Sequence, residues 1–545
     1  MKPPDVFVKP DRIQRLEWIL ALLLAVAIIA LMAVRGFSAG ALWRDQCGTT
    51  QLALMPLGEL LRNFDHQTLP PLLPLVYRLY LKSFGSADST TQWFRLIAAA
   101  ALIGAALVGR RMNRGQPPLF LLALFGLNSV FLYWGGYTVT AVSIAFVSLL
   151  AAGLLLEPGK ARAAGFAIAA FISVQLLINN LLLLMVLSTS AIIACLFRLS
   201  YKLALFFASV LIVCALSDVV YLHIYAAADW RILLKRPMTF AWLWPQVRGA
   251  FGMPPWLTLS LWFAVFVATL AAAGWRLFVA WRGSDESRCR LSIFAILVGF
   301  AAPTAYCSSF LLSGIGAAES RHFLPMLAVL APNFDLIVTH LANQAWARLL
   351  RIALSVAVLA IVPFASWKEI TQRQTNIDLV AQKIEQEAGS GDLVIVNPWS
   401  VGISFDRYYH GPARWLTVPN ISDHRIHRYD LVKEKMMSAT PLEDLKHEIV
   451  TTLHGGNRVW VVGTLAPPEN PGVPLFPFPA PDPEFGWQHM IYREAWTRQL
   501  RDFMNRHARQ ARCLIEPMAN VNPLENVPLW LVDGENQGLP LNAPP

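Results

Sequence analysis

Long apolar runs alternate with short polar loops along the first two thirds of the chain. A transmembrane helix needs about 20 mainly apolar residues, and the sequence offers such runs repeatedly. They lie at about residues 17–37, 93–110, 118–134, 137–156, 162–178, 180–197, 202–224, 256–280, 291–312, 323–341 and 349–366. This pattern predicts an α-helical polytopic membrane protein with about eleven transmembrane helices and termini on opposite sides of the membrane.

The basic residues between these runs predict the orientation of the chain. The first run follows Lys2, Lys9, Arg12 and Arg15 and is not followed by a small-residue cleavage site, so we expect a retained anchor and a cytoplasmic N-terminus. Threading from there places the basic residues of five later loops on the cytoplasmic side: Arg110, Arg111 and Arg114; Lys160 and Arg162; Arg198 and Lys202; Arg282, Arg288 and Arg290; Arg348 and Arg351.

Three regions are then long enough to work outside the cytoplasm. The first outer loop, residues 38–92, contains an apolar segment, residues 69–84, that is broken by prolines and predicts an interfacial helix. The second region covers residues 225–255, and the third begins at Trp367. We therefore expect a membrane domain over residues 1–366 and an extracytoplasmic domain over residues 367–545.

The C-terminal region alternates helical and strand patterns. Helical periodicity at residues 376–388, 441–453 and 494–512 alternates with strand-like runs at 392–397 and 458–462 and near Leu514 and Leu529. This alternation predicts a small, open, soluble α/β sheet. Its polar and aromatic strings, Asn397-Pro398-Trp399, Asp406 to Gly411 and His427 to Asp430, suit either carbohydrate binding or core packing, and core packing is the simpler interpretation.

Composition agrees with a membrane protein and excludes other classes. Of 545 residues, 55% are hydrophobic and 15% charged, and the mean hydropathy of +0.46 excludes a disordered, coiled-coil or ordinary soluble protein. The net charge of +10 comes mainly from the short loops, so it indicates membrane topology and not a nucleic-acid partner. The six cysteines show no zinc-binding or disulfide-scaffold spacing.

The first candidate for chemistry is Asp45, just beyond the first apolar run. It lies beside Trp43 and Arg44, where a carboxylate would meet an amphipathic substrate whose polar head sits at the bilayer surface. On position alone, a solvated loop aspartate is the simpler interpretation of Asp45.

The order of motifs around Asp45 resembles the first loop of the GT-C glycosyltransferases. After Asp45 come the segment Asp65 to Leu72, Phe84-Gly85 and Trp93-Phe94-Arg95-Leu96, and a late element runs from Glu319 to Pro325. This order is similar to that of the protein mannosyltransferase and aminoarabinose transferase branch, glycosyltransferase family 39. Two positions depart from the family pattern: Gln46 replaces the second acid of an Asp-Glu pair, and His322 replaces the tyrosine after the late arginine.

The resemblance implies a GT-C-like fold and inverting transfer of a sugar from a polyprenyl-phosphate donor to an acceptor outside the cytoplasm. The acceptor would be a lipid, a glycan or a protein. In that reaction Asp45 would be the general base. Cations would stabilise the departing phosphate, and the remaining candidates for substrate contact are Arg321, His322, Arg95, His66, Arg44, and Lys235 or Arg236. No cofactor is implied with certainty, although a divalent cation fits this kind of reaction, and the expected location is a bacterial plasma (inner) membrane.

Two other classes of protein stay open at this point. A secondary transporter or lipid flippase would show an inverted repeat of spans and broken helices in both halves. No such repeat is visible, and the long first loop has no counterpart in the second half. The third class is an assembly protein whose membrane part has lost activity, which the Asp45-Gln46 departure permits.

Overall fold

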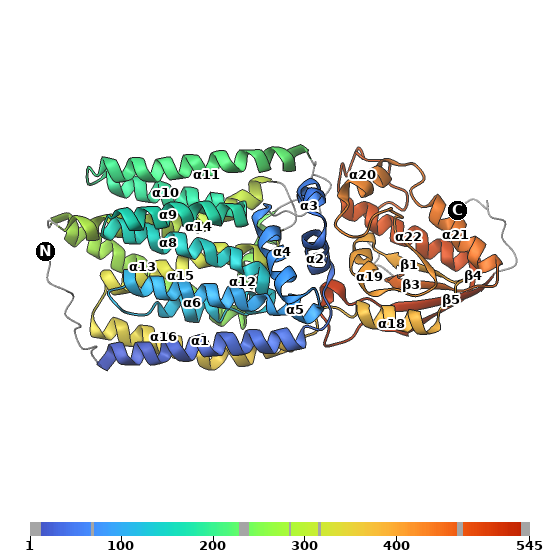
Figure 1. The fold of residues 1–545 in the computed structure, drawn as a ribbon, viewed down its shortest axis with the longest axis horizontal. Coiled ribbons are helices and arrows are strands. Elements are labelled where there is room, and N and C mark those ends of the chain that lie inside the picture. Colours follow the sequence, from blue (N-terminus) through green and yellow to red (C-terminus); the bar gives the residue numbers. More distant parts are fainter. Residues whose placement is uncertain are drawn as a thin grey trace.

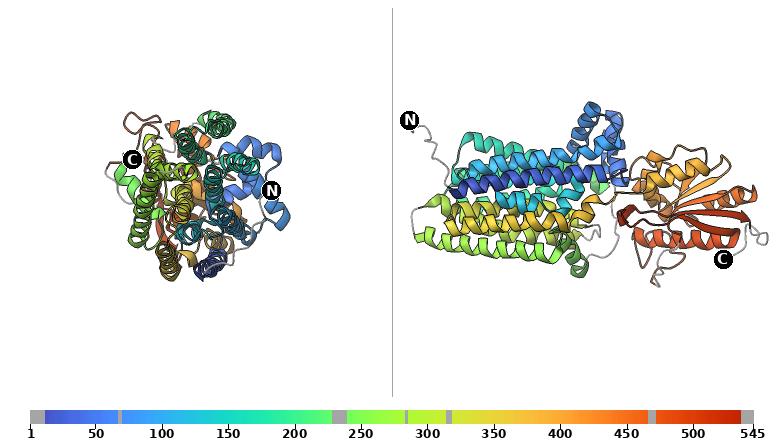
Figure 2. Two further views of the ribbon diagram at one scale, coloured as in Figure 1. Left: turned by 90° about the vertical axis from the view of Figure 1, so that its left-hand side faces the viewer. Right: turned by 90° about the horizontal axis from the view of Figure 1, so that it is seen from below.

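The protein consists of a long helical bundle with an α/β module at one end (Figure 1). The computed structural model describes residues 12–66, 70–227, 239–282, 285–313, 318–465 and 472–535. Helix α1 (Arg12–Ser38), the first described element, begins at the end of the bundle far from the module. The right-hand view in Figure 2 shows the same elongated arrangement, and the left-hand view looks along the bundle.

Within these residues, nine helical segments are long and apolar enough to cross a membrane. The helices in them are α1 (Arg12–Ser38), α6 (Arg95–Met112), α8 (Val139–Leu156), α10 (Asn179–Leu196), α11 (Tyr201–Ala227), α13 (Pro255–Arg282), α14 (Glu286–Ser313), α15 (Leu324–His340) and α16 (Ala345–Ala365). A further predicted span is the slightly shorter helix α9 (Lys160–Leu176). The prediction of a polytopic helical membrane protein with a C-terminal α/β region is therefore confirmed, with about nine spans in place of eleven.

The predicted span at residues 118–134 is wrong as a regular helix. The segment contains a π-helical turn, Leu121–Gly126, and then α7 (Ser129–Trp134), which begins afresh because the side chain of Asn128 caps the amides of Val130 and Phe131. Asp335 of α15 accepts hydrogen bonds from two further amides at the start of this segment. A hydropathy pattern depends only on how apolar the residues are. It therefore cannot show where the hydrogen bonds of a helix are interrupted.

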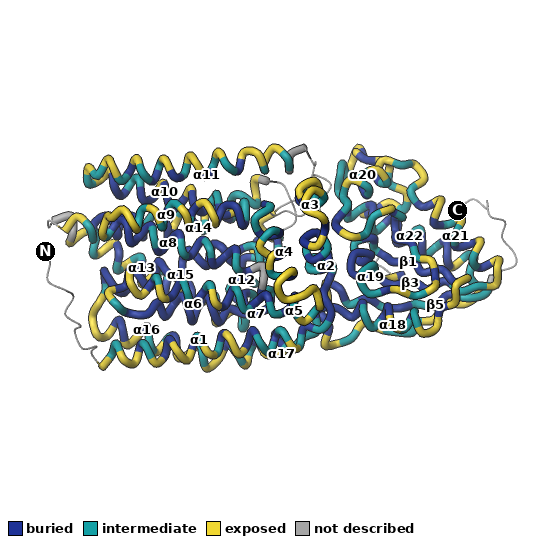
Figure 3. The backbone as a smooth tube through the Cα atoms, viewed as in Figure 1, coloured by how far each residue is buried: buried dark blue, intermediate teal, exposed yellow. Residues whose placement is uncertain are grey.

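The helices differ in how much of their surface is covered (Figure 3). Helix α15 is buried along almost its whole length in the centre of the bundle, whereas α11 is apolar all round and exposes residues such as Leu205 and Leu216. A helix that is apolar on every side but covered on only one is typical of contact with lipid. The exposed apolar surface therefore marks the membrane-facing side of the bundle.

Buried ion pairs tie the first and last spans together at the N-terminal end of the bundle. Glu17 of α1 accepts hydrogen bonds from Arg348 (2.7 Å) and Arg351 (2.6 Å) of α16, and Arg351 also lies 3.4 Å from Asp335 of α15. We predicted the two arginines as loop charges. The structure instead buries them on α16, because each has a carboxylate partner inside the bundle.

Short helices separate the bundle from the module (Figure 1). They are α2 (Arg44–Leu54), α3 (Leu57–Asn63), α4 (Leu72–Phe84) and α5 (Asp88–Trp93), and α4 corresponds to the segment predicted as an interfacial helix. Helix α4 has one strongly apolar face and buries Leu73, Tyr77 and Leu81 against its neighbours.

The module is built on a five-stranded mixed sheet with strand order β2-β1-β3-β5-β4. Its strands are β1 (Leu393–Asn397), β2 (Arg414–Thr417), β3 (Val459–Gly463), β4 (Ala508–Ile515) and β5 (Leu529–Glu535). Strand β1 is parallel to its neighbours β2 and β3. Strand β5 is antiparallel to both of its neighbours, β3 and β4. β1 and β3 are buried on both faces, as their continuous Val, Ile and Leu runs predict.

The helices of the module cover the sheet, and three of them lie near the helices predicted at residues 376–388, 441–453 and 494–512, whereas two more were not predicted. They include α18 (Ile377–Glu387), α19 (Gly402–Tyr408), α20 (Tyr429–Met437), α21 (Glu443–His454) and α22 (His489–His507). One hydrophobic core of the module also takes in Leu42 and Cys47 from the first outer loop. The loop therefore packs as part of the module as well as part of the bundle.

Candidate active site

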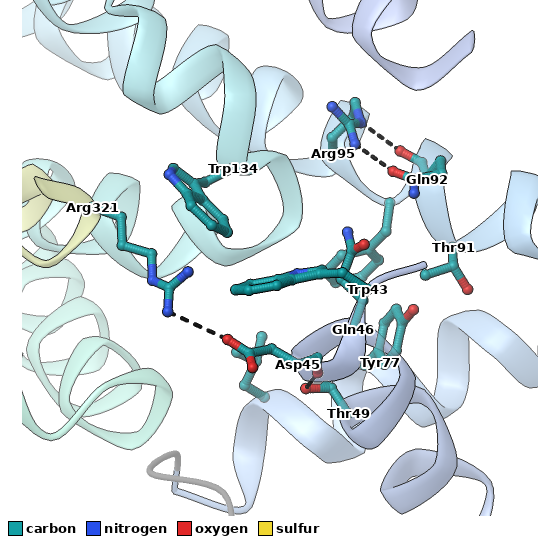
Figure 4. A pocket seen from close by; sticks show the side chains of 12 residues that line it. Trp43, Asp45, Gln46, Thr49, Tyr77, Thr91, Gln92, Arg95, Trp134 and Arg321 are labelled. Atoms are coloured by element: carbon teal, nitrogen blue, oxygen red, sulfur yellow. Dashed lines mark hydrogen bonds and ion pairs between the residues drawn. The ribbon is translucent and has the colours of Figure 1, made fainter. Parts of the chain in front are cut away.

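A cavity lies at the end of the bundle that faces the module. Its empty space is about 660 Å³, part of it open to solvent. Its walls come from α2, α4, α5, α6, α7 and the turn before α15, and are formed by Trp43, Asp45, Gln46, Thr49, Leu73, Tyr77, Thr91, Gln92, Phe94, Arg95, Trp134 and Arg321. Three of the residues predicted from the sequence, Asp45, Arg95 and Arg321, therefore share one cavity (Figure 4).

Asp45 enters this cavity from the first turn of α2. An acidic side chain is favourable there because the amides at a helix N-terminus carry partial positive charge. The hydroxyl of Thr49 donates to the Asp45 carbonyl oxygen at 2.8 Å, one turn further along the helix. The carboxylate is about one quarter exposed, so it can meet a ligand in the cavity.

Arg321 reaches the same carboxylate from the short turn Ser320–Phe323, which precedes α15. The guanidinium Nη2 lies 3.3 Å from Asp45 Oδ2 and 3.3 Å from Glu319 Oε2. Figure 4 shows the guanidinium directed at Asp45 with two indole rings beside it. Its central carbon lies 4.2 Å from the ring centroid of Trp134 and 5.3 Å from that of Trp43, within range of cation–π attraction.

The backbone around Arg321 is held by its own neighbours. The ring nitrogen Nδ1 of His322 accepts the Glu319 amide at 3.0 Å, and the hydroxyl of Tyr306 donates to the His322 carbonyl oxygen at 2.7 Å. His322, which we predicted as a substrate contact, thus shapes the turn and is not among the residues that line the cavity.

The opposite wall carries a second guanidinium. Arg95 is almost fully buried and donates to the Gln92 carbonyl oxygen at 2.7 Å and to the Gln92 side-chain oxygen at 2.5 Å. Gly135, with a φ of +51°, packs against it so closely that an added Cβ would lie 2.7 Å from Arg95 Cβ. Because glycine has no Cβ at this position, Arg95 can pack beside the cavity without a steric clash.

Three nitrogen donors around the cavity are buried without a hydrogen-bond partner. They are Nη1 of Arg321, Nη1 of Arg95 and Nε2 of Gln92. Buried polar atoms are almost always paired, so unpaired donors beside a cavity are candidates for binding a ligand. Two guanidinium groups and an amide suit an anion rich in acceptor oxygens, such as a phosphate.

The module contributes residues that sequence reasoning did not place in the site. His427 Nε2 lies 3.5 Å from Asp45 Oδ1. The predicted candidate Arg44, from α2 and not from the module, approaches the same oxygen with its Nε at 3.7 Å. Burial raises the pKa of Tyr429, and the nearby negative charge of Asp45 adds to this shift. The string His427 to Asp430 was the available signal, but its residue types fit core packing equally well.

The remaining predicted residues lie around the cavity or outside the described part of the chain. His66 Nδ1 lies 4.0 Å from Asp430 Oδ1, at the junction with the module. Arg44 donates from its backbone amide to Glu525 (3.0 Å) and from its side chain to the Leu524 carbonyl oxygen (3.2 Å), so it joins the loop to the module. Lys235 and Arg236 lie outside the residues that the structure describes.

Comparison with known proteins finds similarity among solved structures and none among protein-family models or curated sequences. The backbone is similar to that in the crystal structure of ArnT from Cupriavidus metallidurans bound to undecaprenyl phosphate. The match covers 82% of this chain and 92% of that chain, at 12% identity and a TM-score of 0.45.

The donor set around Asp45 does not fit a metal ion. Among the described residues, no group of three or more His, Cys, Asp or Glu side chains is arranged to hold one. Two guanidinium groups, those of Arg44 and Arg321, already approach the Asp45 carboxylate. A divalent cation at this point would be repelled by both.

Taken together, the cavity offers one carboxylate that can accept a proton and several donors that can hold an anion. Asp45 faces the space between the two walls, and the unpaired donors of Arg321, Arg95 and Gln92 lie around it. A base beside an anion-binding wall is the arrangement that group transfer from a phosphate-linked donor needs.

Proposed function

We propose that the protein is an integral membrane glycosyltransferase. It moves a sugar from a polyprenyl-phosphate-linked donor to an acceptor on the extracytoplasmic face of the membrane, with inversion at the anomeric carbon. The observation that carries the proposal is the pairing of Asp45 with Arg321 in a cavity whose lining residues also carry buried, unpaired nitrogen donors of the kind that bind phosphate. The motif order in the first outer loop supports the same activity.

In this proposal Asp45 is the general base. It removes the proton from the acceptor hydroxyl while that oxygen forms a bond to the anomeric carbon. The bond from this carbon to the phosphate oxygen breaks, and its electron pair leaves with the lipid phosphate. The product is a new glycoside, and the proton stays on the Asp45 carboxyl group until it passes to solvent.

Arg321 serves the base and the leaving group at once. Its Nη2 contacts Asp45, while its Nη1 is buried without a partner and is free to donate to a phosphate oxygen. Fixed donors stabilise the growing negative charge of a leaving group most strongly in a site that excludes water. Arg95 and Gln92 supply further donors from the opposite wall.

The two indole rings at the cavity suit the sugar. Trp43 and Trp134 lie with their centroids 5.2 Å apart and both line the cavity. Aromatic faces combine apolar area with little conformational freedom, so they can pack against the apolar face of a pyranose ring while polar groups bind its hydroxyls.

The test is transfer of labelled sugar by the purified full-length chain in lipid nanodiscs. A panel of synthetic polyprenyl-phosphate monosaccharides is offered with and without candidate acceptors, and donor binding is measured in parallel. We expect transfer or slow donor hydrolysis by the wild type. Asp45→Asn should lower that rate by about 100-fold to 10,000-fold and keep donor binding.

Asp502→Asn is the matched control. This carboxylate lies on the surface of α22, where it pairs with Arg501, and we expect its removal to leave transfer unchanged. Failure of the wild type to bind or cleave any donor would overturn the proposed function. Equal rates for the wild type and Asp45→Asn, or a product with retained anomeric configuration, would overturn the role given to Asp45.

A further inference from the structure

The segment before α20 brings the module directly over the helix that carries Asp45. Ile426 is 1% exposed and packs into a small apolar cluster with Leu52, Met55 and Leu60 of the first outer loop. Arg425, one residue earlier, lies 2.8 Å from Glu59 of α3. The buried Ile426 cluster fixes the backbone next to His427 relative to α2, and the largely solvated Arg425–Glu59 pair adds little to it.

His427 follows immediately and contacts the carboxylate of Asp45. Its Nε2 lies 3.5 Å from Asp45 Oδ1, whereas Arg321 approaches the other oxygen, Oδ2. The ring of Tyr429 is stacked nearly parallel to the imidazole at 5.6 Å, and the ring of Trp399 meets it edge-on at 6.2 Å. Two aromatic neighbours therefore hold the imidazole plane in place while its Nε2 faces the carboxylate.

Other polar groups around His427 are engaged with partners of their own. Arg44 contacts Asp45 and the turn Pro523–Glu525 of the module, and Asp430 is held by Arg428 at 2.5 Å. On the far side of Trp399, its indole nitrogen donates to His489 at 3.1 Å. Asp45 is thus a carboxylate that the structure places against the His427 ring.

From this contact we infer that His427 is a positioning residue for Asp45, supplied by the C-terminal module, and that it takes over the proton that Asp45 removes. The inference rests on the proposed function. The proton moves from the acceptor hydroxyl to Asp45 and then from Asp45 Oδ1 to the neutral imidazole Nε2. The resulting imidazolium releases it to solvent, so both side chains return to their starting state.

The distance is compatible with this role. A separation of 3.5 Å is long for a hydrogen bond, but contacts of this kind are often loose before substrate binds and tighten in the reacting complex. Histidine is suited to the task because its ordinary pKa lies near neutrality, so a carboxylic acid can pass it a proton. The α/β module is then a part of the active site and not only a cover over it.

The experiment compares His427→Ala and His427→Gln with the wild type in the nanodisc transfer assay, with and without added imidazole. We expect kcat to fall about 10-fold to 100-fold while the donor KM stays unchanged, because the donor-binding wall is intact. Added imidazole should restore part of the activity of His427→Ala but not of His427→Gln, whose side chain fills the space.

Two variants separate this role from a structural one. Arg425→Gln removes a neighbouring contact between the module and the loop but keeps His427, and His447→Ala removes an exposed histidine from α21. Both should keep the wild-type kcat. Full activity of His427→Ala, or a loss of kcat that Arg425→Gln reproduces and imidazole does not reverse, would overturn the inference. A wild type without transfer or donor cleavage would instead overturn the proposed function, and this inference with it.

Discussion

Arg321 Nη2 and Asp45 Oδ2 lie 3.3 Å apart although 276 residues separate them in the chain. The carboxylate belongs to the first helix after the first span, and the guanidinium to the turn that leads into α15. The contact therefore closes the cavity between the earliest and one of the latest parts of the bundle. It also places a fixed positive charge where the proposed reaction develops negative charge.

Replacing Arg321 should affect the chemical step more than folding. We expect Arg321→Ala to lower kcat by about 100-fold to 1000-fold, the usual effect of removing one donor to a developing anion. Arg321→Lys should recover part of this loss because it keeps the charge but not the planar fork that lies over Trp134. Steady-state transfer assays give both values. Arg62→Ala, an exposed cation on α3, should behave as wild type, and an active Arg321→Ala would contradict the proposed role.

Docking of the module should depend on Asp88 at the start of α5. This carboxylate accepts hydrogen bonds from Arg407 at 2.7 Å and from the Tyr408 hydroxyl at 2.5 Å, both on α19. We expect Asp88→Asn to lower the free energy of unfolding by about 1 to 3 kcal/mol, as for other partly buried, charge-assisted hydrogen bonds. Thermal unfolding and limited proteolysis of the module would show the loss.

The matched control for Asp88 is an aspartate–arginine pair on the surface. Asp285 lies 3.2 Å from Arg288, and both side chains are more than 40% exposed. Such pairs contribute little to stability, so Asp285→Asn should leave unfolding and proteolysis unchanged. The docking role of Asp88 fails if the two variants behave alike.

Stability should fall as pH rises toward neutrality because of Glu525. Burial raises the pKa of this carboxyl group from 4.5 to about 7. The folded protein therefore keeps a proton that the unfolded chain loses above about pH 4.5. The stabilising contribution of the protonated group is complete below that pH and is lost as pH rises through 7, by up to about 3 kcal/mol.

Glu525→Gln tests this effect because an amide cannot titrate. Thermal unfolding of the variant between pH 4.5 and 7.5 should lack the part of the decline that belongs to Glu525, so the two stability curves diverge toward pH 7. Glu516→Gln, which changes an exposed carboxyl group of the same module, should follow the wild type. Parallel curves for the wild type and Glu525→Gln would show that Glu525 is already ionised in the folded state.

The ion pairs at the opposite end of the bundle should affect the stability of the protein but not its kcat. Glu17→Gln leaves Arg348 and Arg351 buried with weakened partners, and breaking a buried pair costs about 3 to 5 kcal/mol. We expect a lower unfolding temperature but an unchanged kcat for the protein that remains folded. Glu286→Gln, a mostly exposed carboxylate beside Arg290, should change neither quantity. A fall in kcat at temperatures where Glu17→Gln is fully folded would connect this end of the bundle to the active site.

Sequence patterns predicted those elements whose periodicity is strong and local. The runs at 392–397 and 458–462 correspond to β1 and β3, and most of the apolar runs correspond to helices. The span at 118–134 could not be recognised as irregular, because Asn128 ends one helical stretch and begins another, and Asp335 binds amides of this segment from a distant helix. Such contacts depend on the tertiary structure and leave no local signal.

The residues of the candidate site were likewise only partly predictable from the sequence. Asp45, Arg95 and Arg321 were found through motifs in the membrane part, and the structure gathers them in one cavity. His427 and Glu525 were not found, because their meeting with Asp45 and Arg44 depends on how the module docks. Only the three-dimensional arrangement distinguishes a histidine packed in a core from one that faces a carboxylate.

Because the first outer loop packs into the module, it can reach its final structure only after the module has been synthesised. Leu42 and Cys47 lie in the hydrophobic core of the module, and the Arg44 amide donates to Glu525, 481 residues later in the chain. A ribosome completes this loop long before it makes the residues that bury it. The loop must therefore wait without its final partners until the module has been translated, and no nascent chain that stops short of residue 525 can hold the finished site.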